Sequence, residues 1–253
     1  MLFDTWHLFK KYLRISLRMP MWTIFGLIQP LLWLLIFSAL FGGFASMPGF
    51  PAASYIDYFL PGVVVMTVLF GSSWSGVSLL RELTAGTVAR MLVSPISRTA
   101  VVLSRVLHSA FLVLLQVIIV LLTALPLGAH ITTQISFILA GLTAVVLLGV
   151  AFASISNGLA IMLQREEPLV MIGNLMTLPL MFFSTAMVPQ QFMPSWLQYA
   201  AMFNPVEYGV QAARAALQAN PDAGVFWPAA GITALFAIAA TAWAVSAFKA
   251  LRD

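Results

Sequence analysis

The stretch Leu79–Arg98 reads LLRELTAGTVARMLVSPISR and interrupts a chain that is otherwise almost free of charge. It carries three of the chain's 12 Lys and Arg residues, together with a glutamate, a glycine and a proline. On both sides of it the sequence stays apolar for more than the length of one helix. The stretch therefore separates two long apolar segments, and the fold has to accommodate it at an edge of the apolar region.

The overall composition identifies lipid as the main solvent of this chain. Of its 253 residues, 61% are hydrophobic and 8% are charged, whereas a soluble domain carries about 25% charged residues. So few charges do not cover a water-exposed surface. The chain has no cysteine, which excludes disulfides and thiolate metal sites. Its first residues mix charged and bulky side chains, unlike a cleavable signal peptide.

Charge-free intervals, divided at turn signals, predict six membrane-spanning helices, since one span needs about 20 mostly apolar residues. The predicted spans are residues 21–41, 58–80, 99–125, 135–163, 168–185 and 225–248. We therefore expect an all-α integral membrane protein with one transmembrane domain over residues 1–253.

Basic residues predict the orientation of these spans. If both termini lie on one side of the membrane, the other side holds only Arg214. The first side then holds Lys10, Lys11, Arg14, Arg18, Arg81, Arg90, Arg98, Arg105, Arg165, Lys249 and Arg252. The positive-inside rule places that side, and both termini, in the cytoplasm. The net charge of +4 is explained by this topology, so we expect no nucleic-acid partner.

Residues 1–20 form a predicted amphipathic helix that lies in the membrane interface. Polar residues repeat at helical spacing on one face, which holds Asp4, His7, Lys11, Arg14 and Arg18. The opposite face holds Leu2, Trp6, Phe9 and Leu13. Such a helix serves as an anchor to lipids or as a lever that contacts a cytoplasmic partner, and the two roles are compatible.

Residues 187–223 are too polar to span the membrane and too apolar for a free loop. Pro194 suits the first turn of a short helix. Asn204-Pro205 is a turn signal, and residues 206–219 suggest a second short helix. We expect an external re-entrant hairpin that packs on its own bundle or lines a vestibule. Glu207 and Arg214 share one face of it and are expected to contact each other only loosely, in a structural role.

The chain shows no motif for catalysis. No lysine follows a glycine-rich phosphate-binding run, and the histidines and carboxylates are too dispersed for a metal site or an intramembrane enzyme. We expect no cofactor in this chain.

Two predicted spans carry stripes of small or polar residues at helical spacing. One stripe consists of Thr67, Gly71, Ser75 and Ser78, and the other of Asn174, Thr177, Met181 and Ser184. Small residues allow helices to pack closely, and amides bond across helices. The stripes therefore indicate either helix packing or a path for an amphipathic solute.

The opening stretch resembles the cytoplasmic segment of ABC-2 type ABC transporter permeases. Its matching residues are Glu82, Gly86, Thr87, Leu92, Pro95 and Arg98. The stretches Pro30–Gly42, Tyr55–Phe70 and Met193–Leu217 are similar to the first span, the entrance of the second span and the last external hairpin of that family. The resemblance covers nearly the whole chain and is strongest to the daunorubicin-resistance type of membrane subunit. Ala89 departs from it, since many members carry an acidic residue there.

The resemblance implies a dimer of six-helix subunits, formed with a second copy or a related permease, and two cytoplasmic ATPase subunits that bind ATP and Mg²⁺. It implies that the N-terminal helix and residues 81–98 contact the ATPases, that spans two and five line the path, and that the hairpin caps it. The stripes described above fall on those two spans.

Residues 81–98 suit a coupling role on physical grounds as well. Gly86 breaks the helix, Thr87 caps a new short one, and a proline ends it. The expected coupling residues are Arg81, Glu82, Gly86, Thr87, Arg90, Met91, Leu92, Pro95 and Arg98. The alternative is an ordinary cytoplasmic loop.

The leading hypothesis is the membrane subunit of an ATP-driven exporter in a prokaryotic plasma membrane. Its solute would be a hydrophobic or amphipathic drug or lipid-like molecule. The alternative from another class is a secondary transporter or channel that works without ATP.

Overall fold

The computed structural model describes residues 2–18, 20–87 and 98–250. This part of the chain is 84% helical and contains no strand, which confirms the predicted all-α class. The helices are α1 (Leu2–Arg18), α2 (Pro20–Leu40), α3 (Tyr55–Thr84), α5 (Arg98–Ala124), α6 (Ile135–Leu163), α7 (Glu166–Phe182), α8 (Ser195–Met202), α9 (Pro205–Leu217) and α10 (Ala223–Lys249).

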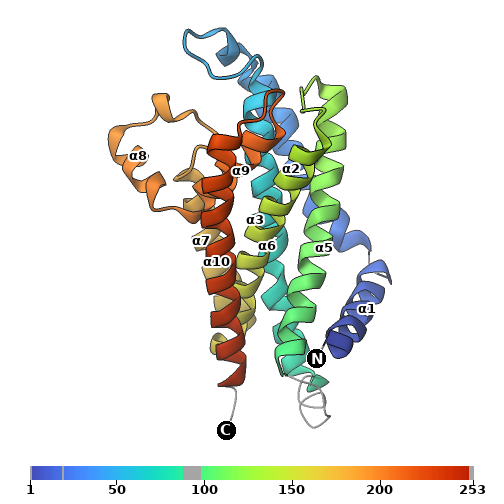
Figure 1. The fold of residues 1–253 in the computed structure, drawn as a ribbon. Coiled ribbons are helices and arrows are strands. Elements are labelled where there is room, and N and C mark those ends of the chain that lie inside the picture. The colour runs from blue at the N-terminus through green and yellow to red at the C-terminus, as the bar shows by residue number, and fades with distance from the viewer. Residues whose placement is uncertain (1, 19, 88–97, 251–253) are drawn as a thin grey trace.

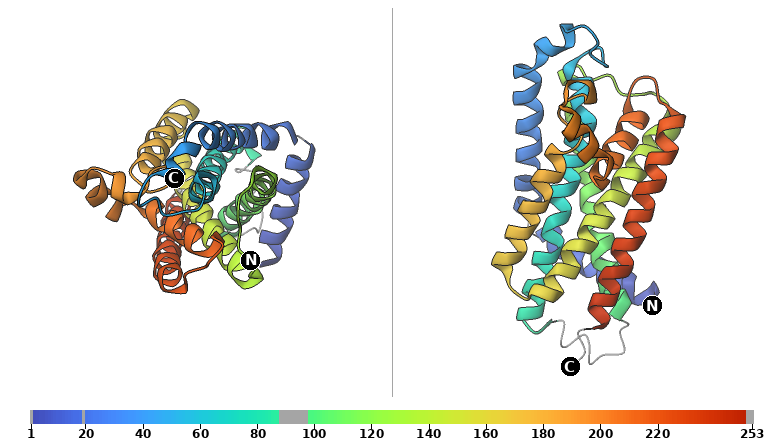
Figure 2. Two further views of the ribbon diagram at one scale, coloured as in Figure 1. Left: turned by 90° about the horizontal axis from the view of Figure 1, so that it is seen from above. Right: turned by 90° about the vertical axis from the view of Figure 1, so that its left-hand side faces the viewer.

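The long helices run side by side as one bundle, and α1 lies across one end of it against α5 (Figure 1). The same end holds the last turn of α3, the first turn of α5 and the last turn of α10. The short helix α8 projects sideways near the opposite end (Figure 1 and Figure 2). The charged ends of these helices and the amphipathic α1 thus lie at the same end of the bundle.

Four helical segments among the described residues are long and apolar enough to cross a membrane. They are Tyr55–Thr84, Thr99–Leu127, Ile135–Leu163 and Ala223–Lys249. The helices α2 and α7 occupy the two remaining predicted spans, residues 21–41 and 168–185. Six helices therefore lie where spans are predicted.

The centre of the bundle is α3, which packs against α2, α5, α6, α7 and α9. Its side chains from Val63 to Leu69 are buried without a gap, so this span has core packing on all sides. Ser54 caps its start by accepting a hydrogen bond from the Asp57 N–H. The helix ends at Thr84, beyond the predicted end at residue 80, and Gly86 follows with a φ of +66°.

A very close backbone approach in the core joins α3 to α6. A Cβ atom on Gly76 would lie 2.1 Å from the Ser156 carbonyl oxygen. The Gly76 N–H donates to the Ser156 hydroxyl at 3.0 Å, and that hydroxyl donates to the Ser73 carbonyl at 2.5 Å. Glycine is thus needed at this position because the two backbones nearly touch.

The predicted hairpin of two short helices corresponds to α8 and α9, and their turn is at Asn204-Pro205. Asn204 caps α9 by accepting a hydrogen bond from the Val206 N–H at 2.9 Å. The two helices differ in their surroundings, since α9 is buried among α3, α6 and α10, whereas α8 is largely exposed. Only α9 is part of the packed core.

We predict that Gly76→Ala destabilises the protein by about 1–3 kcal/mol, because the added methyl group forces α3 and α6 apart. Gly231→Ala on α10 is the matched control, since nothing lies within 4 Å of its Cβ position. Thermal unfolding of the purified full-length protein measures both variants. Equal midpoints for the two variants would contradict the packing described here.

Candidate functional site

A buried cluster of charged and aromatic residues joins three helices at the end of the bundle that holds α1. Arg105 on α5 is 3% exposed and forms an ion pair with Glu82 on α3. The other carboxylate oxygen of Glu82 lies 3.6 Å from Lys11 Nζ. The Tyr12 hydroxyl donates to Glu82 at 3.4 Å. We call Lys11, Tyr12, Glu82 and Arg105 the α1–α3–α5 corner.

Tyr12 connects α1 to the other residues of this corner. The Arg105 guanidinium lies 4.7 Å from the centre of the Tyr12 ring, a cation–π distance. Burial raises the pKa of Tyr12 to about 12, so its hydroxyl stays protonated and donates to Glu82. A second contact joins Ser16 Oγ to His108 Nε2 at 2.8 Å. The helix α1 is therefore held by specific polar contacts to the bundle in addition to any contact with lipid.

The packing of α1 differs from the predicted division into two faces. Phe9 is buried as expected, but Leu8 and Tyr12 are buried beside it, whereas Trp6 of the predicted apolar face is half exposed. The face that packs on α5 is therefore centred on Phe9 and Tyr12. This leaves Phe3, Trp6 and Leu17 as an exposed apolar face, which suits contact with lipid.

The corner lies at the two ends of the predicted coupling segment, residues 81–98. Glu82 is the second residue of this segment and Arg105 follows its end, so their ion pair joins α3 to α5. A displacement of either helix end would disturb the contacts of the other and of α1. The geometry thus links α1, α3 and α5 mechanically at one point.

The remaining predicted coupling residues differ in position. Arg81 is exposed and pairs with Glu166 at the start of α7, with 2.7 Å between Nη2 and Oε1. Gly86 takes the left-handed conformation that follows the end of α3, and Thr87 follows it. Arg98 is the first residue of α5. Four predicted residues lie outside the described residues: Arg90, Met91, Leu92 and Pro95.

The two predicted stripes do not form one continuous surface. Buried members are Thr67, Thr177, Met181 and Ser184, and the exposed members are Ser78 and Asn174. Gly71 faces Gln116 and Val113 on α5. Ser75 accepts a hydrogen bond from the Asn157 amide at 3.0 Å. Part of each stripe is thus used for close helix packing. Asn174 lies on the exposed part of α7, which can contact a solute or a second subunit.

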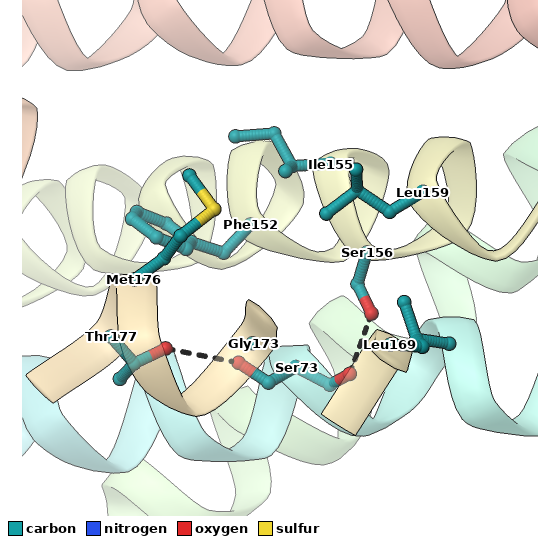
Figure 3. Close-up of a pocket in the computed structure, with 9 residues that line it drawn as sticks. All are labelled: Ser73, Phe152, Ile155, Ser156, Leu159, Leu169, Gly173, Met176 and Thr177. Carbon is teal, nitrogen blue, oxygen red and sulfur yellow. Dashed lines mark hydrogen bonds between the residues drawn. The ribbon is translucent and has the colours of Figure 1, made fainter. Parts of the chain in front are cut away.

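Sequence reasoning missed the contribution of α6. Ser156 bonds to α3 through Ser73 and Gly76, Asn157 bonds to Ser75, and Ser154 lies 3.0 Å from Thr241 on α10. These residues form a row of hydrogen-bonded polar groups inside the apolar bundle, which we call the polar seam; Figure 3 shows its bond between Ser156 and Ser73. The sequence signal was the run Ser154–Asn157, with polar residues in an otherwise apolar span.

A second buried group of charges lies near α8 and α9. The Thr185 hydroxyl donates to Glu207 at 2.8 Å and accepts from Arg214 at 3.0 Å. Arg214 also donates to the Thr185 carbonyl at 2.7 Å and lies 4.1 Å from the centre of the Tyr58 ring. Glu207 and Arg214 thus both bond to Thr185 and join the segment after α7 to α9, which is a structural role.

The described residues contain no group of three or more His, Cys, Asp or Glu side chains that could hold a metal ion. The charged groups described above pair with neighbouring residues and join helices to one another. The α1–α3–α5 corner is the candidate functional site because it combines buried charge with a place next to the predicted coupling segment.

We predict that Glu82→Gln destabilises the protein by about 3 kcal/mol, because it leaves the buried Arg105 charge without its partner. Glu166→Gln is the matched control, since it removes the same charge from an ion pair with Arg81 whose side chains are 57% and 44% exposed. An exposed pair contributes less than about 1 kcal/mol. Thermal unfolding measures both variants, and a larger effect of Glu166→Gln would show that the corner is not a stabilising contact.

Comparison with known proteins identifies related transport permeases. A putative transport permease, ycf38, of Cyanophora paradoxa is 33% identical over 198 residues, which is 78% of this chain and 68% of the relative. The probable doxorubicin resistance ABC transporter permease protein DrrC of Mycobacterium tuberculosis is 27% identical over 201 residues, with 79% and 71% covered. The daunorubicin resistance ABC transporter permease protein DrrB1 of Streptomyces coeruleorubidus is 25% identical over 223 residues, with 86% and 77% covered.

The family model for the ABC-2 type transporter matches residues 4–218, a range that begins in α1 and ends just after α9. It includes the α1–α3–α5 corner, the residues of the polar seam on α3 and α6, and the buried group around Thr185. The resemblance inferred from the sequence is thereby confirmed, and this chain belongs to the ABC-2 type transporter family of permeases.

Proposed function

We propose that this chain is the membrane subunit of an ATP-driven exporter of a hydrophobic or amphipathic solute. ATP and Mg²⁺ are bound by two separate cytoplasmic ATPase subunits, and a second permease copy or a related permease completes the transporter. Six spans cross a prokaryotic plasma membrane with both termini in the cytoplasm, as the distribution of Lys and Arg favours.

The observation that carries this proposal is the α1–α3–α5 corner. Residues 88–97 lie between Glu82 and Arg105, and these two side chains are joined to each other and to Tyr12. A push on the segment by an ATPase would therefore move α3, α5 and α1 together. In this arrangement Glu82 acts as a positioning residue within its own subunit, while Arg90 and the other residues of the segment are left to contact the ATPase.

The names of the relatives support the solute class. Two of them are described as ABC transporter permease proteins of doxorubicin or daunorubicin resistance. The polar groups inside the bundle suit an amphipathic molecule, since Ser75, Asn157 and Thr177 provide neutral hydrogen-bonding groups within an apolar surrounding. Exposed Asn174 extends these polar groups to the surface of α7.

We predict that Glu82→Ala combined with Arg90→Ala lowers solute-stimulated ATP hydrolysis by about fivefold or more, because coupling between sites is lost. The protein is reconstituted with the partner ATPase of the proposed transporter, and ATP hydrolysis is measured with and without doxorubicin. Asp57→Ala with His130→Ala is the control, because it removes an acid–base pair at the opposite end of α3. Normal stimulation in the Glu82/Arg90 variant, with normal insertion, would refute the coupling role. Transport that continues without ATP would favour a secondary transporter or channel.

We predict that Asn174→Leu changes the ratio of transport rates for two solutes by about tenfold, since loss of a hydrogen-bonding group alters discrimination. Ser75→Leu should act in the same direction. Doxorubicin and a fluorescent lipid analogue are compared in proteoliposomes. Thr143→Leu is the control, because Thr143 is exposed on α6 and bonds only to its own helix at Leu139. An unchanged ratio for Asn174→Leu and Ser75→Leu would limit these residues to helix packing.

A further inference from the structure

The structure separates the basic residues of α1 into two groups. Lys11 belongs to the α1–α3–α5 corner, where its Nζ lies 3.6 Å from Glu82. Lys10, Arg14 and Arg18 are exposed outside the corner. Within the part of the chain that the structure describes, the side chains of Arg14 and Arg18 have no ion-pair or hydrogen-bond partner. Three cationic side chains of one helix are therefore available to a partner outside the subunit.

These three residues form one row along the helix. They follow one another at a spacing of four residues, and Trp6 precedes Lys10 by the same spacing. Residues four apart are neighbours on the surface of a helix. Lys10 Nζ lies 5.1 Å from the centre of the Trp6 ring, which is a cation–π distance. We call Lys10, Arg14 and Arg18 the basic row.

An exposed apolar edge runs beside the basic row. It consists of Trp6, 49% exposed, and Leu17, which follows Arg14 by three residues and is 71% exposed. A soluble anion could neutralise the row but would leave these apolar side chains in water. A phospholipid satisfies both, because its phosphate can meet the cations and its acyl chains the apolar side chains. Tryptophan is also enriched at membrane–water interfaces.

The position of α1 suits a lipid partner. Figure 2 shows α1 at the periphery of the bundle, seen from above. Phe9 packs edge to face on Phe111 of α5, with 6.1 Å between the ring centres. The helix thus lies beside the first half of a segment that is long enough to cross a membrane. Under the proposed topology, this is the level of the headgroups of the inner leaflet.

The charge of α1 favours an anionic headgroup. The helix contains four basic residues and one acidic residue, Asp4, which lies in its first turn. A zwitterionic headgroup brings its own cation to the row, whereas an anionic headgroup brings a net negative charge. Each Lys or Arg next to an anionic surface strengthens binding by about fivefold. The row therefore selects among lipids by charge.

We propose that the basic row of α1 and its apolar edge bind the phosphate headgroup of an anionic phospholipid in the inner leaflet. This inference goes beyond the proposed function, because the lipid is a resident of the membrane and not the exported solute. On the inward side of the same helix, Tyr12 and Ser16 contact Glu82 and His108. A bound lipid thus holds from outside the helix that the corner holds from inside.

Binding is tested with a fluorescent reporter, since the chain has no cysteine of its own. Leu17→Cys is labelled with bimane, an apolar group, and the full chain is placed in phosphatidylcholine liposomes without an ATPase. Brominated phosphatidylglycerol and brominated phosphatidylcholine are compared as quenchers at equal mole fractions. We expect phosphatidylglycerol to act at a mole fraction lower by about fivefold or more. Equal quenching by the two lipids would overturn the proposal.

A second reporter shows whether the preference is local to α1. Met162→Cys is 65% exposed near the end of α6, at the same end of the bundle. We expect the two brominated lipids to quench a bimane at this position equally. The same preference at Met162→Cys and at Leu17→Cys would show general attraction to the charged end of the bundle, and would refute a site on α1.

Variants at Arg14 test the role of the charge. Arg14→Gln should reduce the preference at the Leu17 reporter by about fivefold, whereas Arg14→Lys should keep it because the charge remains. Combining Arg14→Gln with Lys10→Gln and Arg18→Gln should abolish it. Arg165→Gln is the matched control, because it removes an exposed cation next to α7. An equal loss in Arg165→Gln and Arg14→Gln would overturn the assignment to the row.

Two further measurements distinguish other partners of the row. Glycerol 1-phosphate should not relieve quenching by phosphatidylglycerol, because it has no acyl chain for the apolar edge. Relief by this soluble phosphate would overturn the assignment to lipid. Binding of the partner ATPase is measured separately with Arg14→Gln. If this variant loses the ATPase but keeps its preference for phosphatidylglycerol, the row is a docking surface for protein and the proposal is refuted.

Discussion

Lipid offers no hydrogen-bond partner to a polar group, so partners inside the apolar region of this protein have to come from the protein itself. Most of the partners are supplied in three places: the α1–α3–α5 corner, the polar seam between α3 and α6, and the group around Thr185. Each place joins at least two helices. The polar residues of a largely apolar chain therefore determine which helices are fixed to each other.

The three places also divide the molecule along its length. The corner fixes α1 to α3 and α5, and the group around Thr185 fixes α9 to the segment after α7. Between them, Gly76 and Ser156 hold α3 close against α6. A membrane subunit that receives movement at one end and opens at the other needs firm contacts at both ends. Under the proposed function, α3 is the element that connects them.

The helix α7 differs from its neighbours in ways that matter for the proposed function. It has a buried face with Thr177 and Met181 and an exposed face with Asn174. No atom lies within 4 Å of the Cβ position of Gly173, whereas neighbouring atoms crowd the Cβ positions of the glycines in α3 and α6. Space beside α7 and polar groups on two of its sides make it the part of the bundle best suited to contact a solute.

The sequence by itself determined that lipid is the solvent, that the chain is all-helical, where the long helices lie and to which family the chain belongs. These properties depend on composition, local periodicity and short motifs, which are all readable along the chain. Only the tertiary structure decided which face of α1 packs on the bundle and which charges pair. Glu82 meets Arg105 from 23 residues away and Tyr12 from 70 residues away. Such contacts depend on how helices pack against one another, and local sequence patterns hold no information on that register.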